Sequence, residues 1–182
     1  MRKLMLLDNA TLDGHLARRS DVNAAVLFSV VDQQFDWQAE LLADYDTMLF
    51  GRVSFQKGAL FYPTHPSALA SRMNSMSKVV FSNSLESLDW APSRLATAAP
   101  ADELARLRGK QGGNICIKGS PTLARTFSRQ GLIDEYVFIV HPVIAGSDGV
   151  PHFDDPADLP ALKLLDVTEL AAGAVALTYA RA

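Results

Sequence analysis

Cysteine is nearly absent from this sequence, which contains only Cys116. One cysteine forms no disulfide within the chain and does not supply the several thiolates of a cysteine zinc site. The four histidines, His15, His65, His141 and His152, are scattered without the spacing of metal ligands. We therefore expect no metal site and no disulfide framework, and the reduced cytoplasm as the compartment.

Long hydrophobic runs and blocks of one charge are also missing. The longest apolar runs hold a few residues each, far short of the ~20 that a membrane helix needs. Asp8, Asn9 and Asp13 interrupt the amino-terminal segment before the apolar core of a signal peptide is complete. The formal net charge is −3, and no Lys/Arg cluster of the kind that binds nucleic acid or membrane surfaces is present. We expect a small-molecule partner.

The composition is that of a folded chain, because 48% of its 182 residues are hydrophobic and this length buries a sizeable core. No repeat, low-complexity segment or linker divides the sequence. We therefore expect one domain over residues 1–182.

Apolar runs and helix-forming segments alternate through the middle of the chain. Strands are expected at residues 4–7, 47–50, 78–82, 114–118 and 133–146, and helices at residues 35–44, 67–76, 101–108 and 121–130. The last apolar runs, joined around Ala172 and Gly173, predict a terminal β-hairpin. Crossover helices join parallel strands, whereas a hairpin is antiparallel, so the pattern predicts an α/β fold with a mixed, mainly parallel sheet.

Three of the expected strands end in residues suited to binding an anion. The segment LFGRVSF places Gly51, Arg52 and Ser54 between a strand and the first turn of a helix. Glycine permits close approach of the backbone, arginine offers a planar fork for phosphate, and a helix start has free N–H groups. The alternative is a strand-to-helix corner with a solvated arginine, which the residues alone favour.

The segment KVVFSNS places Ser82 and Asn83 after the next strand. Such residues bind phosphate or ribose, but they are equally the usual residues of a turn. This segment alone does not decide between the two.

The segment NICIKGSPTLAR places Gly119, Ser120, Pro121 and Thr122 at the junction of a strand and a helix. The dipole and free N–H groups of a helix start favour an anion there. The segment matches neither GxGxxG nor GxxxxGK[ST], so it indicates neither a dinucleotide fingerprint nor an ATP loop. An ordinary junction is the alternative.

The order and spacing of these pieces resemble a known family, the dihydrofolate-reductase-like fold and, within it, the carboxy-terminal reductase domain of RibD from riboflavin biosynthesis. The matching segments are TLDGHLA, LFGRVSF, KVVFSNSL, ICIKGSPTLAR, GLIDEYVFIVHPVIAG and the following HF, which run from near residue 4 to residue 153. Each segment is loose, but their shared order over most of the chain is specific. The resemblance implies a three-layer fold with helices on both faces of the sheet and a C-terminal β-hairpin.

The resemblance implies that NADPH is bound along these strand ends. The residues carried over are Gly51, Arg52 and Ser54 for the pyrophosphate and adenosine phosphate, Ser82 and Asn83 for the 2′-phosphate and ribose, and Gly119, Ser120, Pro121 and Thr122 for the pyrophosphate. An arginine fork near a 2′-phosphate favours NADPH over NADH. Where the family has paired glycines, this chain has Lys118 and Gly119, so the third segment departs from the family pattern.

The same resemblance implies substrate contacts. TLDG looks like the SLDG motif of the riboflavin reductases, which makes Asp13 the first candidate for catalysis and substrate binding, with Thr11 on the same strand face. From spacing alone, Asp13 and Gly14 are a turn pair. Asp36 lies where dihydrofolate reductases carry an acid, and beside Trp37 its carboxylate could have a raised pKa for proton delivery. The Pro-Trp signature before that acid is absent, and an N-terminal helix charge is the alternative.

Two functions of different class follow. The first is an NADPH-dependent oxidoreductase that transfers a hydride to a C=N bond of a small heterocycle or sugar imine, in the class of riboflavin-pathway pyrimidines or pterins. The second is a nucleotide-binding or regulatory module of the same fold without turnover. A homodimer is expected under either, because long β runs such as YVFIVHPVI need coverage and the family often forms homodimers.

Overall fold

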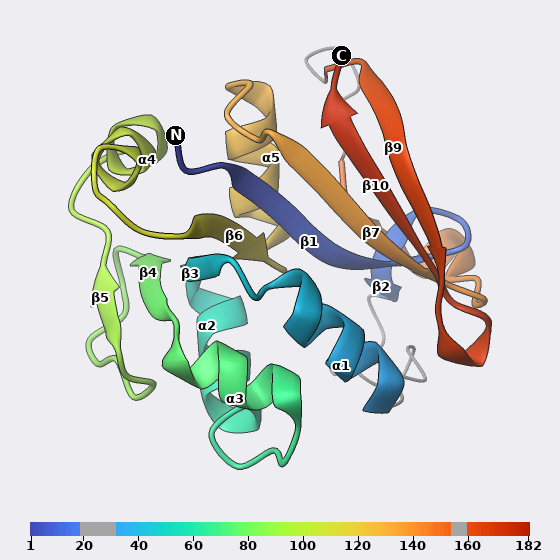
Figure 1. Cartoon of the computed structure of the whole chain (residues 1–182), viewed down its shortest axis with the longest axis horizontal. Coiled ribbons are helices and arrows are strands. Elements are labelled where there is room, and N and C mark those ends of the chain that lie inside the picture. The colour runs from blue at the N-terminus through green and yellow to red at the C-terminus, as the bar shows by residue number, and fades with distance from the viewer. Residues whose placement is uncertain (19–31, 154–159) are drawn as a thin grey trace.

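The computed structural model describes residues 1–18, 32–153 and 160–182. Within these residues an eight-stranded sheet has the order β5-β4-β3-β6-β1-β7-β10-β9 (Figure 1). Its strands are β1 (Leu4–Thr11), β3 (Tyr45–Gly51), β4 (Ser77–Phe81), β5 (Ser93–Leu95), β6 (Asn114–Lys118), β7 (Glu135–His141), β9 (Leu162–Glu169) and β10 (Val175–Arg181). The strands from β5 to β7 pair in parallel, whereas β10 pairs antiparallel with both β7 and β9. The expected mixed, mainly parallel sheet is confirmed.

Helices cover both faces of this sheet, which confirms the three-layer arrangement. One face packs against α1 (Asp32–Leu41), α2 (Arg52–Phe61) and α3 (Ala68–Ser75), and the other against α4 (Pro100–Arg108) and α5 (Pro121–Arg129). The helix expected over residues 35–44 begins three residues earlier and ends at Leu41. Ser67 caps α3, because its hydroxyl accepts a 3.1 Å hydrogen bond from the backbone N–H of Ala70.

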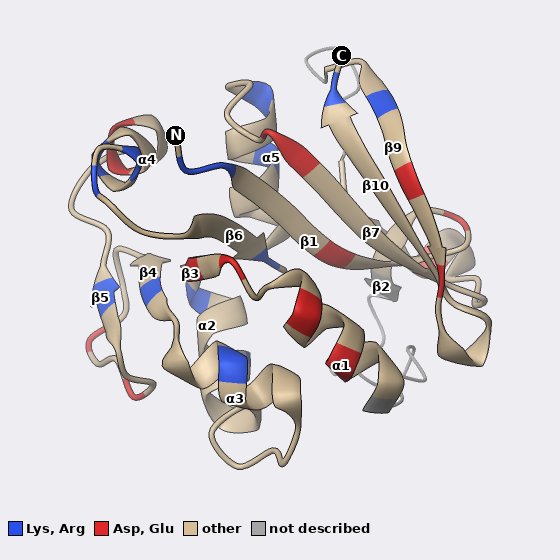
Figure 2. Cartoon of the chain, in the orientation of Figure 1, with Lys and Arg blue, Asp and Glu red and all other residues tan. Residues whose placement is uncertain are grey.

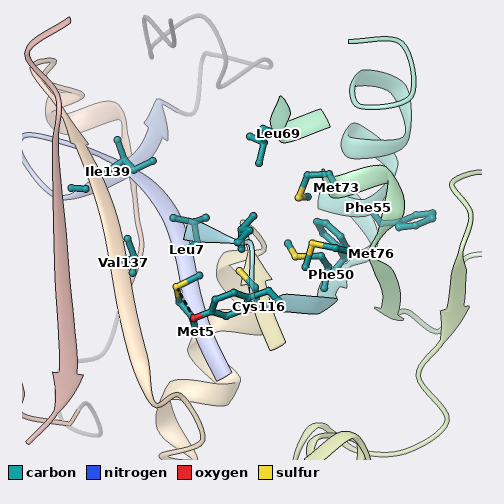
Figure 3. Close-up of a cluster of buried hydrophobic side chains, with 14 of the residues drawn as sticks. Met5, Leu7, Phe50, Phe55, Leu69, Met73, Met76, Cys116, Val137 and Ile139 are labelled. Carbon is teal, nitrogen blue, oxygen red and sulfur yellow. Dashed lines mark hydrogen bonds between the residues drawn. The ribbon is translucent and has the colours of Figure 1, made fainter. Parts of the chain in front are cut away.

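The alternation of side chains along β1 divides the core into two layers. Leu4 and Leu6 pack toward α4 and α5, whereas Met5 and Leu7 pack toward the three helices of the other face. Figure 3 shows the second group, in which Cys116 lies among buried apolar side chains. Burial raises the pKa of the Cys116 thiol to about 12, so the thiol remains protonated in the core.

The terminal hairpin is confirmed, with β9 and β10 joined through a short 3-10 turn, Ala171–Gly173. The outer strand, β9, forms the edge of the sheet and carries four exposed apolar side chains. These are Leu162, Leu164, Leu165 and Val167, with 41%, 49%, 51% and 56% of their surface exposed.

A second, small sheet was not predicted from the sequence. It pairs β2 (His15–Arg18) antiparallel with β8 (Gly149–Pro151). A Cβ added at Gly149 would collide with the ring of His15, so this close pairing depends on a glycine at that position.

Among the described residues, no helix is long and apolar enough to cross a membrane, and no group of three or more His, Cys, Asp or Glu is arranged to hold a metal ion.

Candidate functional site

The three predicted strand ends lie side by side at the carboxyl ends of neighbouring strands. β4, β3 and β6 are neighbours, and Gly51 pairs with Phe81 at the ends of β3 and β4. Leu49 pairs with Ile117, so Gly51 and Gly119, each two residues further on, are at the same level. The structure therefore brings together the three segments that the sequence singled out, at the end where ligands bind to parallel sheets.

Ser120 joins the first and third of these segments directly. Its hydroxyl accepts a 2.7 Å hydrogen bond from the backbone N–H of Gly51 and donates a 3.1 Å bond to the hydroxyl of Ser54. A Cβ added at Gly51 would lie 2.5 Å from Ser120 Oγ, and one added at Gly119 would lie 3.4 Å from Ser54 Oγ. Only small residues fit at this junction.

The backbone at Ser120, directly before α5, is in the left-handed region. Gly119 and Ser120 both have φ near +64°, a region that costs a residue with a side chain about 1–3 kcal/mol. Neither α5, which starts after Ser120, nor α2, which starts after Gly51, has a side-chain cap or an acidic residue in its first turn. The starts of α2 and α5 are therefore in contact through Ser120 and have no side-chain cap, as is typical of helix N-termini that bind anions.

The second segment lines a neighbouring cavity. Ser82 and Asn83 border a cavity of about 620 Å³, together with the segment from Ala96 to the start of α4 at Pro100. The Ser82 hydroxyl accepts hydrogen bonds from the N–H groups of Ser84 (3.2 Å) and the residue after it (3.1 Å). This serine thus has the turn role that the sequence left open, while its position beside the cavity keeps it available to a ligand.

Arg52 is the first residue of α2 and its side chain is exposed. Its Nη1 donates a 3.1 Å hydrogen bond to Gln56 Oε1, one turn along the same helix. The described contacts do not connect Arg52 with Ser82 or Asn83, so its role toward a 2′-phosphate stays a prediction.

The side chains of Thr11 and Asp13 contact each other, but not across a strand face as expected, because β1 ends at Thr11 and Asp13 lies in the turn that the bond from Gly14 N–H to the Thr11 carbonyl closes. Thr11 Oγ1 donates a 2.6 Å hydrogen bond to Asp13 Oδ1, and the backbone N–H groups of Ala145 and Gly146 donate to the same carboxylate at 3.0 and 2.8 Å. The Thr11 bond and then these backbone bonds hold the pKa of Asp13 well below its usual range. Asp13 is therefore a carboxylate that anchors a loop, and any catalytic role would be electrostatic rather than proton donation.

Asp36 lies on the exposed side of α1. The side chains of this helix that are buried are the amides Gln34 and Gln38. Gln34 donates a 2.8 Å bond to the carbonyl of Ala171, and Gln38 Oε1 accepts a 2.6 Å bond from Lys118 Nζ. Proton delivery by Asp36 stays a prediction, and its exposed position does not favour it.

The sequence analysis missed a buried polar cluster at the end of β1. Asp8 and His152 are 4% and 5% exposed, and both contact Asn9. Burial raises the pKa of Asp8 and lowers that of Lys118, which lies at the end of the neighbouring β6. His141 Nε2 lies 3.0 Å from the side-chain oxygen of Asn9. The available signal was a charged residue directly after the apolar run LMLL.

The fold is a dihydrofolate-reductase-like α/β fold. It is defined by the order of the parallel strands, by the two helices that start together at the carboxyl ends of these strands, and by the closing hairpin. Residues 2–176 match the model of the RibD C-terminal domain. The chain belongs to that family.

The chain is also similar to individual proteins and solved structures. The chain is 27% identical over 183 residues to the uncharacterized protein YyaP of Bacillus subtilis (strain 168), covering 98% of this chain and 94% of the relative. A Shewanella sp. PV-4 protein named for riboflavin biosynthesis has the same fold, with a TM-score of 0.77 at 21% identity and 99% of each chain covered. The diaminohydroxyphosphoribosylaminopyrimidine deaminase/5-amino-6-(5-phosphoribosylamino)uracil reductase of Thermotoga maritima also superposes, with a TM-score of 0.69 at 15% identity, covering 100% of this chain and 57% of that one.

His141 gives a test of the cluster at the end of β1. Burial lowers its pKa from 6.5 to about 4, so between these values the unfolded chain binds a proton that the folded chain does not. Stability from this residue is therefore present above pH 6.5 and is lost as the pH falls toward 4. Between about pH 7 and about pH 4.5 the loss should reach about 2 kcal/mol.

The measurement is the free energy of unfolding by urea as a function of pH, in wild type and in His141→Gln. Glutamine retains an N–H donor for Asn9 but does not titrate in this range. The difference between the two proteins should shrink as the pH falls. A constant difference would show that His141 titrates normally in the folded protein.

Proposed function

We propose that residues 1–182 form one reductase domain that transfers a hydride from NADPH to a C=N bond of a small heterocycle or sugar imine. The observation that carries this proposal is the pair of uncapped helix N-termini held together by Ser120 and Gly51, beside a cavity of about 620 Å³. NADPH, when bound, supplies the hydride. Such an enzyme would act in the cytoplasm.

The residues at the junction fit the phosphates of this cofactor. Gly51 and Gly119 let the side chains of Ser120 and Ser54 approach the backbone closely, and the starts of α2 and α5, which have no side-chain cap, are in contact here. Neither helix start carries an acid that would repel a pyrophosphate. Figure 2 places charges of both signs across the elements rather than in one basic block, which supports binding through local N–H groups and the single fork of Arg52.

Membership of the RibD C-terminal domain family supports the substrate class. The name of the Thermotoga maritima protein gives a deaminase and a uracil-derivative reductase activity, and we propose only the reductase activity for this chain. A riboflavin-pathway pyrimidine is therefore the first candidate, and a pterin the second.

A nucleotide-binding module without turnover is the second candidate. It is favoured by the positions of the two predicted acids, because Asp13 is held ionised by hydrogen bonds and Asp36 is exposed. Such a module would bind NADPH at the same junction but would not oxidise it.

Titration with NADPH, followed by its fluorescence, separates these two candidates. The reductase binds NADPH and oxidises it when 5-amino-6-(5-phosphoribosylamino)uracil or dihydrofolate is added, whereas the module only binds it.

Arg52→Ala should weaken NADPH binding by about tenfold, or about 1.4 kcal/mol, and NADH binding much less, because only NADPH has a 2′-phosphate. Gln56→Ala, which removes the partner of Arg52 in α2, is the matched control. Equal weakening of both cofactors would refute the 2′-phosphate role.

The junction itself is tested by Gly51→Ala. The added Cβ would lie 2.5 Å from Ser120 Oγ and push the two helix starts apart. The Kd for NADPH should rise by roughly tenfold. The second change Ser120→Gly removes the obstructing hydroxyl and suits the positive φ, so the double variant should recover part of the affinity.

Leu60→Ala is the control for this series, because Leu60 is in the same helix and 83% exposed. It should bind NADPH like wild type. Wild-type affinity in Gly51→Ala would contradict the phosphate-binding role of the junction.

A homodimer is part of this proposal. The exposed apolar side chains of the edge strand β9 support it, because a single chain would leave them in water. Light scattering after size exclusion should give twice the mass of one chain, and Leu165→Lys should shift the protein to the monomer. A monomeric wild type would contradict the dimer and leave the reductase proposal intact.

A further inference from the structure

Lys118 is the last residue of β6 and directly precedes Gly119, which belongs to the junction proposed to bind phosphate. Ile117 packs toward α4 and α5, whereas Cys116 packs toward the helices of the other face. By alternation, Lys118 lies on the face of Cys116, and its Nζ donates a 2.6 Å hydrogen bond to Gln38 Oε1 in α1. The side chain therefore extends from the strand end toward α1.

The ammonium group of Lys118 has no ion-pair partner in the part of the chain that the structure describes. Gln38 Oε1, a neutral acceptor, takes one of its three N–H groups. Asp8 acts on it electrostatically from the opposite face of β1, and burial raises the pKa of that carboxyl group. Burial also lowers the pKa of Lys118, yet the side chain is partly exposed, so a ligand can reach it.

Uncharged polar side chains lie on the same face at the ends of the neighbouring strands. Asn9 of β1 is partly exposed, and its side-chain oxygen is 3.0 Å from His141 Nε2 at the end of β7. Burial lowers the pKa of His141 to about 4, so its ring is uncharged at neutral pH. Among these described side chains, which include the buried amide of Gln38, Lys118 carries the only charge.

This group of polar side chains adjoins the junction along the sheet. β3, β6 and β1 are neighbours in that order, the junction joins the ends of β3 and β6, and the polar side chains are at the ends of β6, β1 and β7. The junction is on the same face, because Ser54, which contacts Ser120, belongs to α2.

A hydride passes only between groups in contact, so a substrate lies next to the cofactor. With the cofactor phosphates at the ends of β3 and β6, the ends of β6 and β1 are the adjacent place for the substrate. An ammonium group without an ion-pair partner is stabilised at such a place by a negatively charged ligand group.

We propose that Lys118 is a specificity residue that binds an anionic oxygen of the substrate, from a phosphate or a carboxylate group, at the ends of β6 and β1. The inference rests on the proposed function and adds that the substrate is negatively charged. Gln38 holds the ammonium group in position. Lys118 is also where the chain departs from the paired glycines of the family pattern, so this charge is a feature of the chain itself.

The charge preference is tested by calorimetric titration of the protein saturated with NADP⁺, in which no reduction takes place. Two ligand pairs are compared: 5-amino-6-(5-phosphoribosylamino)uracil with its analogue lacking the phosphate, and dihydrofolate with dihydrobiopterin, a pterin without carboxylates. The wild type should bind the charged member of one pair about tenfold or more tightly, and that pair identifies the anion as phosphate or carboxylate. Equal affinities within both pairs, or no binding of any of the four, would contradict the inference.

Lys118→Met removes the charge and retains the length of the side chain. It should weaken the charged ligand by about 10- to 100-fold, as expected for loss of a charge-assisted hydrogen bond, and leave the neutral ligand unchanged. Lys118→Arg should retain the preference. Gln38→Glu places a carboxylate beside Nζ and should abolish the preference while the neutral ligand binds normally. Lys110→Met, an exposed position after α4 with the same change in net charge, should behave like wild type.

The cofactor is the other source of an anionic oxygen. If Lys118→Met weakens NADPH and NADH equally and leaves the ligand preference intact, Lys118 binds the pyrophosphate and the substrate role is wrong. Turnover separates this inference from the proposed function. An active enzyme whose KM for the charged substrate is unchanged in Lys118→Met refutes the role of Lys118 alone. A wild type that prefers the charged ligand without oxidising NADPH supports that role and contradicts the reductase.

Discussion

The bond between Ser120 and Gly51 is the constraint on which the site depends. It joins residues 69 positions apart and holds the first turn of α5 against the first turn of α2. Because Ser120 has a left-handed backbone, its hydroxyl points back to the end of β3 rather than capping its own helix. The start of each helix is therefore held against the other without a side-chain cap on either, which is the feature on which the proposed phosphate site rests.

Much of the fold followed from sequence pattern. The strand over residues 114–118 and the start of α5 at Pro121 were predicted correctly, because an apolar run and a proline at a first turn are strong local signals. The true length of β1 was missed, since Asp8 and Asn9 end the apolar run although the backbone continues as a strand to Thr11. The small β2–β8 sheet was also missed, because strands of four and three residues carry too little periodicity.

The candidate site was predictable only in part, because local sequence pattern indicates where strands end but not how distant segments pack. Glycines and small polar residues at strand ends are visible in a sequence, so the junction around Gly51 and Ser120 was found. The direction in which a helix faces depends on packing, so the sequence left Asp36 open between an acid beside Trp37 and a helix-terminal charge, whereas in the structure Asp36 is exposed and Gln34 and Gln38 occupy the buried side of α1. The pairing of Asp8 with His152 joins residues 144 positions apart, which local pattern does not reveal.

The lone thiol of Cys116 lies in the central strand layer, fully buried and protonated. Reagents that modify thiols react with the exposed thiolate, so they reach this sulfur only when the sheet itself opens. The chain thus carries an intrinsic reporter of global opening. Because no second cysteine competes for the reagent, the labelling rate measures the stability of the β3–β6–β1 centre without an introduced probe.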